Sequence, residues 1–349
     1  MDQSEKKHQR RIRYKGTHPK YFEAKYKELQ PDKYAETIEK VIQKGMTPAG
    51  MHRPICVTEI MDFLDVHPGQ IGLDATLGYG GHTLEILKRL NHRGHLYAID
   101  QDPLELPRTK KRLADLGYGH DILTINQLNF ADIDIIFSIS GPFDFVIADL
   151  GVSSMQIDNP VRGFTFKHEG PLDLRMNPNT GISARDRLLE MSKDEIEGML
   201  IENADEPYAK EIALEITKEL HQGKGINTTS DLYQVVSTAL KFIHPSRRDE
   251  DIKKSSQRTF QALRIDVNHE YEVLYAFLEK LPSVLKPHGK VAILTFHSGE
   301  DRLVKKSFQY YQRAGIYSEV SDGPIRPSMD EQSSNSRARS AKLRWAIKS

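Results

Sequence analysis

A glycine-rich turn at residues 74–83, Asp-Ala-Thr-Leu-Gly-Tyr-Gly-Gly-His-Thr, is the segment of this chain best suited to chemistry. It follows an apolar run that predicts a strand and precedes one that predicts a helix. Glycines let the backbone approach a ligand closely, and the N-terminus of the following helix offers unpaired N–H groups. The next apolar run, 95–99, ends at Asp100, where a carboxylate can accept hydrogen bonds from a ribose diol. We therefore expect a cofactor that contains adenosine.

The turn alone leaves the identity of that cofactor open. A dinucleotide fingerprint has three glycines in the order Gly-x-Gly-x-x-Gly, and here Gly78 and Gly80 match while Thr83 takes the third position. Asp74, inside the first strand, instead favours a cofactor with positive charge, such as the amino group and sulfonium of S-adenosylmethionine. A methyltransferase, a dinucleotide enzyme and a purely structural turn are the three alternatives, and we favour the methyltransferase.

Other chemically useful residues follow later apolar runs. A parallel sheet binds ligands beyond the C-terminal ends of its strands, so residues from several strand ends meet at one edge. Phe130 follows the third run and suits either an adenine face or a core position at the start of a helix. Asp149 ends the fourth run, and with Ser153 or Ser154 it can hold an exocyclic amine out of conjugation with its ring. His297 ends a later run and is a candidate proton acceptor.

Aromatic and basic side chains are concentrated in the segment that follows the fourth run. Phe164 and Phe166 are candidates for stacking on a base, and Arg162 and Arg175 for contacts with phosphates. An ordered hinge without a ligand is the alternative. For the acidic pair at 300–301, a favourable place in the first turn of a helix is preferred over catalysis.

The composition is that of a soluble cytoplasmic protein. Of the 349 residues, 38% are hydrophobic and 28% are charged. No apolar run approaches the length of a membrane span, and the N-terminus lacks the apolar centre of a secretory signal, so we expect no membrane partner. The one cysteine, Cys56, excludes an internal disulfide and a cysteine-cluster metal site. Because the sequence shows no other metal-ligand cluster, we expect no metal.

The net charge of zero hides two basic segments. Residues 6–27 carry nine Lys or Arg against one Glu, and residues 335–349 carry five with no acid. Segments of this kind face anions, and a polynucleotide is the natural partner. A solvated tail without a partner is the alternative for the first segment.

Strands and helices alternate in the first half of the chain. Strands are expected at 71–76, 95–99, 122–126 and 143–148, with helices between them at about 81–90, 103–116 and 131–137. This α/β alternation predicts a doubly wound, mostly parallel sheet with helices on both faces.

Helical periodicity interrupts this alternation over residues 152–257. The alternation resumes with one long amphipathic helix at 260–281 and a strand at 291–296, and residues 321–340 are expected to form a mobile loop. The chain is therefore predicted to contain a basic N-terminal extension, a first core part, an inserted helical substrate domain and a second core part, at 1–47, 48–151, 152–257 and 258–349.

Taken together, these blocks resemble the bacterial family of ribosomal RNA small subunit methyltransferase H. The resemblance covers about residues 50–349 and rests on DATLGYGGHT, YAIDQDP, IADLGVSSMQID, RGFTF, GPLDLRM, RTFQALRIDVNHE, FHSGEDR and SRARSAKLR. It implies a Rossmann-like class I methyltransferase fold with an inserted helical domain. It also implies S-adenosyl-L-methionine as the cofactor, with contacts at Gly80, Gly81, His82, Asp100, Phe130, Asp149 and Gln156.

The same resemblance implies the reaction, which is methylation of the N4 amine of a cytidine in the decoding region of 16S rRNA. The expected catalytic residues are Asp149, Ser153 and His297, and the expected partner is 16S rRNA or the small ribosomal subunit. The oligomeric state is left open, with a homodimer among the alternatives. A methyltransferase for another RNA, DNA or a small molecule, and a non-catalytic ribosome-assembly factor, are the other functions considered.

Two positions depart from the usual family pattern. Gly299 stands where the family usually has a bulky leucine, and Ser336 stands where it usually has a proline. Neither position lies in the expected cofactor site, so both bear on the choice of RNA target.

Overall fold

The computed structural model describes residues 54–349. Contacts divide the chain into a unit at 1–51 and a unit at 52–349, and the described residues all belong to the second. The extension predicted at 1–47, including its basic segment, therefore lies outside the described residues.

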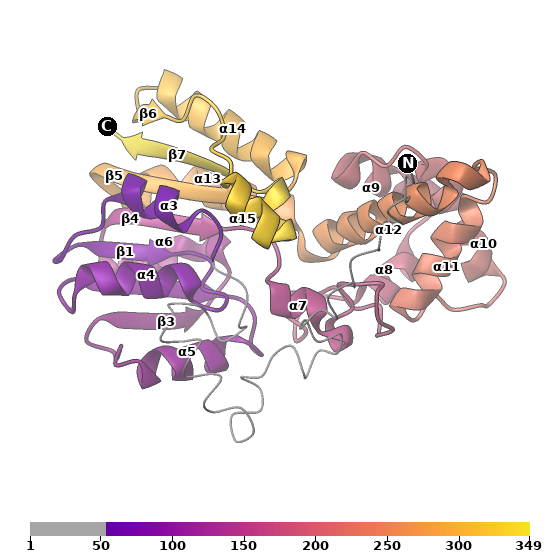
Figure 1. The fold of residues 1–349 in the computed structure, drawn as a ribbon, viewed down its shortest axis with the longest axis horizontal. Coiled ribbons are helices and arrows are strands. Elements are labelled where there is room, and N and C mark those ends of the chain that lie inside the picture. The colour runs from indigo at the N-terminus through magenta and orange to yellow at the C-terminus, as the bar shows by residue number, and fades with distance from the viewer. Residues whose placement is uncertain (1–53) are drawn as a thin grey trace, which may run out of the picture. The chain divides into compact units, whose positions relative to one another are not determined.

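The described residues contain a seven-stranded sheet, which lies on the left in Figure 1. Its strands are β1 (Ile71–Asp74), β2 (His95–Asp100), β3 (Leu123–Gln127), β4 (Phe143–Asp149), β5 (Leu285–Thr295), β6 (Tyr317–Val320) and β7 (Lys342–Lys348). They lie in the order β3-β2-β1-β4-β5-β7-β6. The first five are parallel, and β7 runs antiparallel to both β5 and β6. This arrangement confirms the predicted doubly wound, mostly parallel sheet.

Helices cover both faces of this sheet, because alternate residues of its central strands pack in opposite directions. On β4, Phe145 and Ile147 join one hydrophobic cluster, whereas Val146 and Ala148 join the other. The first cluster includes α3 (Val57–Leu64), α4 (Gly81–Leu90) and α5 (Leu106–Asp115). The second includes α6 (Ile133–Ser140), α13 (Glu270–Val284) and α14 (Ser298–Arg313).

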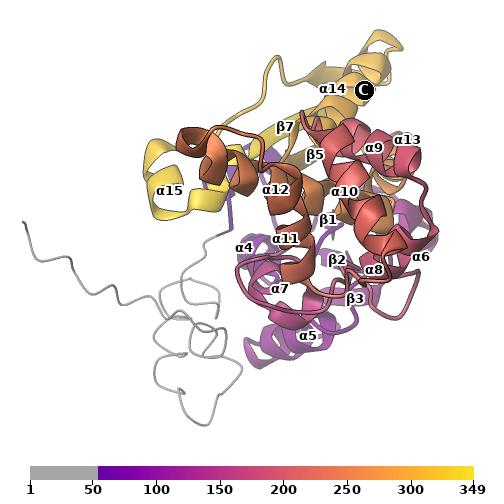
Figure 2. The same cartoon turned by 90° about the vertical axis from the view of Figure 1, so that its right-hand side faces the viewer.

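Between β4 and β5 the chain forms a group of helices with a hydrophobic cluster of its own. After α7 (Ser154–Asp158), the group consists of α8 (Ala184–Glu190), α9 (Lys193–Ala204), α10 (Ala209–His221), α11 (Thr229–Ala239) and α12 (Pro245–Asn268). Helix α10 packs against both α9 and α11 (Figure 2). The capping box at Ser192 and Glu195 begins α9. Helix α12 runs across residues 257 and 258, and the predicted domain limits stay a prediction.

Two expectations from the sequence are wrong. The single helix expected at 260–281 is two helices, because His269 adopts a left-handed conformation with φ 50° between α12 and α13. The loop expected at 321–340 contains α15 (Met329–Ser334) and a 3₁₀ turn, η4 (Ser336–Ser340). Side-chain contacts that periodicity does not show hold this segment, among them an ion pair of 2.9 Å between Arg337 and Asp158.

Further 3₁₀ turns are η2 (Phe130–Asp132) and η3 (Pro160–Arg162). Among residues 54–349, none of the helices combines the length and the apolar character that crossing a membrane requires.

Candidate active site

The point where the strand order reverses lies between β1 and β4, and ligands of open α/β sheets bind at the C-terminal ends of such strands. Asp74 ends β1, Asp100 ends β2 and Asp149 ends β4. The register places Asp74 beside both Ala98 and Ile147, so the three acidic strand ends lie at one edge of the sheet. The sequence predicted this edge as the cofactor site.

The glycine turn between β1 and α4 is shaped by two left-handed residues, Gly78 with φ 49° and Gly80 with φ 67°. Asp100 accepts a hydrogen bond of 2.7 Å from the Gly78 amide, and Thr109 donates one of 2.7 Å to the Gly78 carbonyl. Gly80 is the N-cap of α4, and Gly81 is its first residue. The turn is therefore fixed before any ligand binds, with the helix N-terminus directly behind it.

Asp74 lies beneath this turn. It is only 2% exposed, and its carboxylate accepts hydrogen bonds from the Thr83 hydroxyl at 2.6 Å and from the Thr76 amide at 3.1 Å. Burial raises the pKa of Asp74, although these hydrogen bonds and His82 oppose the shift. Asp74 therefore fixes the turn, since its oxygens accept hydrogen bonds from protein groups.

His82 links this turn to Asp149. Its Nε2 lies 3.0 Å from the carbonyl oxygen of Ile55, which can only accept, so Nε2 carries the proton. Its Nδ1 lies 3.6 Å from Oδ2 of Asp149. Burial lowers the pKa of His82, although the charge of Asp74 opposes the shift. The imidazole is therefore neutral and presents an acceptor nitrogen to Asp149.

Asp149 is the least satisfied acid of the three. Its backbone amide donates to the Thr76 hydroxyl at 2.6 Å, but its Oδ1 is buried and has no hydrogen-bond partner among residues 54–349. Burial and then the charge of Glu300 raise the pKa of Asp149 to about 7, while 31% of its side chain remains exposed. Burial likewise raises the pKa of Asp100 to about 6.

Within residues 54–349, neither Asp100 nor Asp149 forms an ion pair with Lys or Arg. Carboxylates that are buried without a cation favour a ligand that brings one. The amino group and sulfonium of S-adenosylmethionine supply positive charge, and the backbone of the turn is open at Gly78, where a Cβ atom would meet only the Thr76 carbonyl oxygen at 3.9 Å. The residues present thus fit this cofactor.

The remaining predicted cofactor residues lie nearby in different settings. Phe130 begins η2 and meets Phe277 edge to face, with ring centroids 5.3 Å apart, so one part of its ring belongs to the core. Gln156 donates from Nε2 to Asp102 at 2.7 Å and accepts from the Ser153 amide at 2.8 Å. The Ser153 hydroxyl in turn accepts from the Gln156 amide and caps α7. Their roles toward the cofactor and the substrate stay predictions.

Asp102 is a site residue that the sequence reasoning missed. It is 1% exposed and pairs with Arg162 at 2.7 Å, and Arg162 also donates to the carbonyls of Arg175 and Met176. This buried pair joins the loop after β2 to the segment that leads into the helical group. The expectation that Arg162 holds a phosphate is wrong, because its side chain is 4% exposed and its guanidinium donates to Asp102 and to two backbone carbonyls.

Other residues expected to contact RNA are also engaged within the protein. Arg175 pairs with Asp173 through two hydrogen bonds of 2.7 and 2.8 Å. Phe166 stacks on Tyr233 with centroids 5.3 Å apart and packs with Phe260 in the helical cluster. The expectation that Phe166 stacks on a base is therefore wrong, because its ring packs in the hydrophobic cluster of the helical group.

Three of the five basic residues at 335–349 pair with acids of the fold. Lys342 and Arg344 both donate to Asp301, at 2.8 and 2.6 Å, and Arg337 pairs with Asp158. The expectation that the segment 335–349 faces anions is wrong for Arg337, Lys342 and Arg344, which pair with acids of the protein, whereas Arg339 is exposed. The sequence shows that the basic residues are close together, but the acids that pair with them lie far away along the chain and are not evident from it.

The end of β5 supplies His297, which is the N-cap of α14. Its side chain is 9% exposed, and Nε2 lies 3.2 Å from Oε1 of Glu300. The other Glu300 oxygen accepts from the Phe296 amide at 2.8 Å. Asp149 of β4 pairs in register with Leu294 of β5. His297 comes three residues after Leu294, so it lies at the same edge of the sheet as Asp149.

The departure at Gly299 has a packing reason in this structure. A Cβ atom at residue 299 would lie 2.0 Å from the hydroxyl oxygen of Tyr271 on α13, so Tyr271 occupies the space that a leucine would need. Ser336 is the first residue of η4, a position that accommodates proline equally well. Each departure is therefore accommodated by the structure around its own position.

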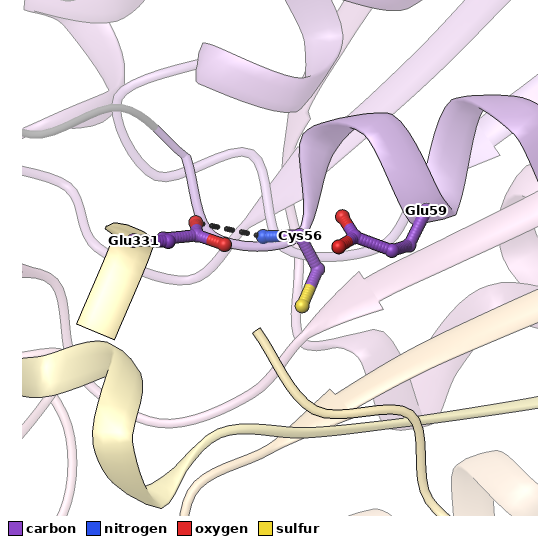
Figure 3. Close-up of side chains that lie close together, drawn as sticks. All are labelled: Cys56, Glu59 and Glu331. Atoms are coloured by element: carbon purple, nitrogen blue, oxygen red, sulfur yellow. Dashed lines mark hydrogen bonds between the residues drawn. The ribbon is translucent and has the colours of Figure 1, made fainter. Parts of the chain in front are cut away.

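Two groups of potential metal ligands occur among the described residues. The first is Cys56 with Glu59 and Glu331, shown in Figure 3. Glu331 of α15 accepts a 3.0 Å hydrogen bond from the Cys56 amide at the start of α3. Burial, reinforced by the nearby acids, raises the pKa of the Cys56 thiol to about 12, so the thiol is protonated. This group is a contact between α3 and α15.

The second group is Glu270 with His297 and Glu300. Arg264 binds both oxygens of Glu270 at 2.7 and 2.9 Å, so an internal cation already pairs with this carboxylate. The expectation of no metal stays a prediction.

Replacing Asp100 tests the cofactor assignment. Asp100→Ala should weaken S-adenosylmethionine binding about tenfold or more, because charge-assisted hydrogen bonds contribute roughly 1.5–3 kcal/mol each and about 1.4 kcal/mol is a factor of ten. Calorimetric titration measures the affinity. Asp115→Ala is the matched control, since Asp115 is exposed at the end of α5 and pairs with Lys111. Equal affinities for all three proteins would refute the assignment.

Comparison with known proteins agrees with this geometry. A family model described as the MraW methylase family matches residues 49–349. A protein from Alkaliphilus metalliredigens named Ribosomal RNA small subunit methyltransferase H 2 is 66% identical over 348 residues, covering 100% of both chains. One from Lachnoclostridium phytofermentans, named Ribosomal RNA small subunit methyltransferase H 1, is 65% identical and covers 98% of this chain and 93% of its own. The chain belongs to the MraW methylase family.

Proposed function

We propose that this protein transfers the methyl group of S-adenosylmethionine to the N4 amine of a cytidine in 16S rRNA. The observation that carries this proposal is the acidic edge of the sheet, where Asp100 and Asp149 are partly buried and form no ion pair with a cation, beside a preformed glycine turn. The names of the full-length relatives, which specify ribosomal RNA of the small subunit, support the substrate class.

The cofactor would be held by residues of the turn and of two strand ends. Gly78 leaves open space in the turn, and Gly80 and Gly81 form the N-terminus of α4. Asp100 offers its carboxylate to the ribose, and His82 and Asp149 form the inner wall. When bound, S-adenosylmethionine supplies a methyl group on a sulfonium, and the amine that accepts this group must lose one proton.

The target amine is a weak nucleophile because its lone pair is delocalised into the pyrimidine ring. Its two N–H groups need two acceptors. Among the predicted catalytic residues at this edge of the sheet, Oδ1 of Asp149 and Nδ1 of His297 are buried and have no hydrogen-bond partner within residues 54–349. We assign these two atoms as the hydrogen-bond acceptors of the amine. Their hydrogen bonds would orient the amine so that its lone pair is no longer delocalised into the ring. Ser153 supports this wall as the cap of α7. To reach these atoms, the base must leave its stack.

Further parts of the proposal follow from the substrate. The partner is 16S rRNA or the small ribosomal subunit, and the protein acts in the cytoplasm, where that subunit is found. The basic segment 6–27 is proposed to contact phosphates by its charge alone, since it lies outside the described residues. A homodimer stays a prediction.

Methylation of stripped RNA tests the reaction. Purified protein with S-adenosylmethionine should methylate RNA from a strain that lacks this gene, and mass mapping of digested RNA should place one added methyl group on N4 of a cytidine in 16S rRNA. RNA from the parental strain is the control and should accept little. A methyl group on another atom or another RNA would indicate a different substrate, and no transfer would indicate a non-catalytic factor.

Asp149→Ala tests the assignment of the amine acceptor. The variant should lower kcat on RNA by about 10²–10⁴-fold, the range of a positioned proton-accepting group, because one of two amine acceptors is lost. Its melting temperature should change little or rise, since a buried carboxylate without a cation is removed. Single-turnover kinetics with saturating cofactor measure the effect. A rate near that of the parent protein would mean that Asp149 does not touch the amine.

A further inference from the structure

The contact between His297 and Glu300 determines which imidazole nitrogen can accept a proton. Glu300 is ionised near neutral pH: burial alone would raise its pKa, but His297, Arg264 and the Phe296 amide together lower it. An ionised carboxylate only accepts protons, and Nε2 of His297 lies 3.2 Å from Glu300, a close charge contact without the geometry of a hydrogen bond. The negative charge of Glu300 therefore favours the proton on Nε2. In the neutral ring, Nδ1 is then the acceptor.

Neighbouring residues confine the imidazole in this position. The Tyr271 ring lies 5.9 Å from it between centroids, and Tyr271 also donates from its hydroxyl to the Asn203 carbonyl on α9 at 3.2 Å. Gly299 makes this placement of Tyr271 feasible, as its missing side chain leaves room for the hydroxyl. The ring of His297 is thus held between α13 and the first turn of α14.

The other charged groups around His297 leave Glu300 as its counter-charge. Glu270 lies within ligand distance of both, but Arg264 binds its two oxygens. Glu300 also acts on Asp149, because its negative charge contributes to the raised pKa of that acid. One buried carboxylate therefore influences both atoms that we assign to the target amine.

We propose that Glu300 is a positioning residue for methyl transfer, which fixes the proton of His297 on Nε2 and so makes Nδ1 the acceptor for the proton that leaves the amine. This inference rests on the proposed function. In the step, the amine lone pair forms the new N–C bond, the methyl–sulfur bond breaks with its electron pair remaining on sulfur, and one N–H proton passes to Nδ1. The resulting imidazolium is stabilised by Glu300 across the contact with Nε2.

Kinetics of two variants test this role. Glu300→Ala should lower kcat by about 10²–10⁴-fold with little change in the KM for RNA, because proton transfer and not binding is affected. Glu300→Gln keeps an oxygen for Nε2–H but removes the charge, so it should lose less activity. In Glu300→Gln the acid limb of the kcat–pH profile should move to lower pH, since the pKa of Asp149 falls without the neighbouring anion.

Asp301→Asn is the matched control. Asp301 lies in the same helical turn, but its partners are Lys342 and Arg344 of β7. This variant should lower the melting temperature without moving the acid limb of the pH profile. A purely structural role of Glu300 would make the Glu300 variants resemble this control, and that result would overturn the proposal.

Nitrogen NMR of histidine-labelled protein reads the tautomer without any activity. The His297 signals are identified by their loss in His297→Asn. The parent protein and Glu300→Gln should show the proton on Nε2, and Glu300→Ala should show a mixture of tautomers. A proton on Nδ1 in the parent protein, or the same tautomer in Glu300→Ala, would refute the role of Glu300. Failure of the proposed function would instead abolish RNA methylation in the parent protein and leave these signals as expected.

Discussion

Burial of three carboxylates at adjoining strand ends is the constraint on which the site depends. Burial is the largest cause of the raised pKa of Asp74, Asp100 and Asp149. Folding therefore favours their protonated forms, and that contribution to stability is lost as pH rises through about 6 for Asp100 and about 7 for Asp149. Near neutral pH the free protein holds negative charge in a poorly solvated place. A cationic cofactor relieves this charge, so its binding stabilises the fold.

The sheet could be predicted because its signals are local. Apolar runs of strand length alternate with amphipathic helices, and a central strand such as 143–149 is apolar on both faces. The break at His269 could not be predicted, because the apolar periodicity continues through it and the break depends on the left-handed conformation of one residue. The helix and the 3₁₀ turn within 321–340 could not be predicted either, since polar contacts such as that of Arg337 with Asp158 order this segment.

The sequence predicts which residues of the candidate site follow strands, but it does not predict which side chains these residues contact. The motifs show that Asp100, Asp149 and His297 follow strands, and a parallel sheet brings such residues to one edge. They do not show which side chains are neutralised inside the fold. Arg162 was assigned to phosphate but pairs with buried Asp102, a contact across 60 residues of sequence. Glu300 looked like a helix-capping acid and also contacts His297.

Proton release on cofactor binding tests the central claim most directly. Titration calorimetry of S-adenosylmethionine at pH 7, in buffers of different ionisation enthalpy, measures the protons released per cofactor bound. With a pKa of about 7 in the free protein, Asp149 is about half protonated, and a bound cation lowers that pKa. We predict release of about half a proton at pH 7, an affinity that increases as pH rises through 7, and loss of this release in Asp149→Asn. A binding enthalpy that is the same in every buffer, for parent and variant alike, would contradict the account.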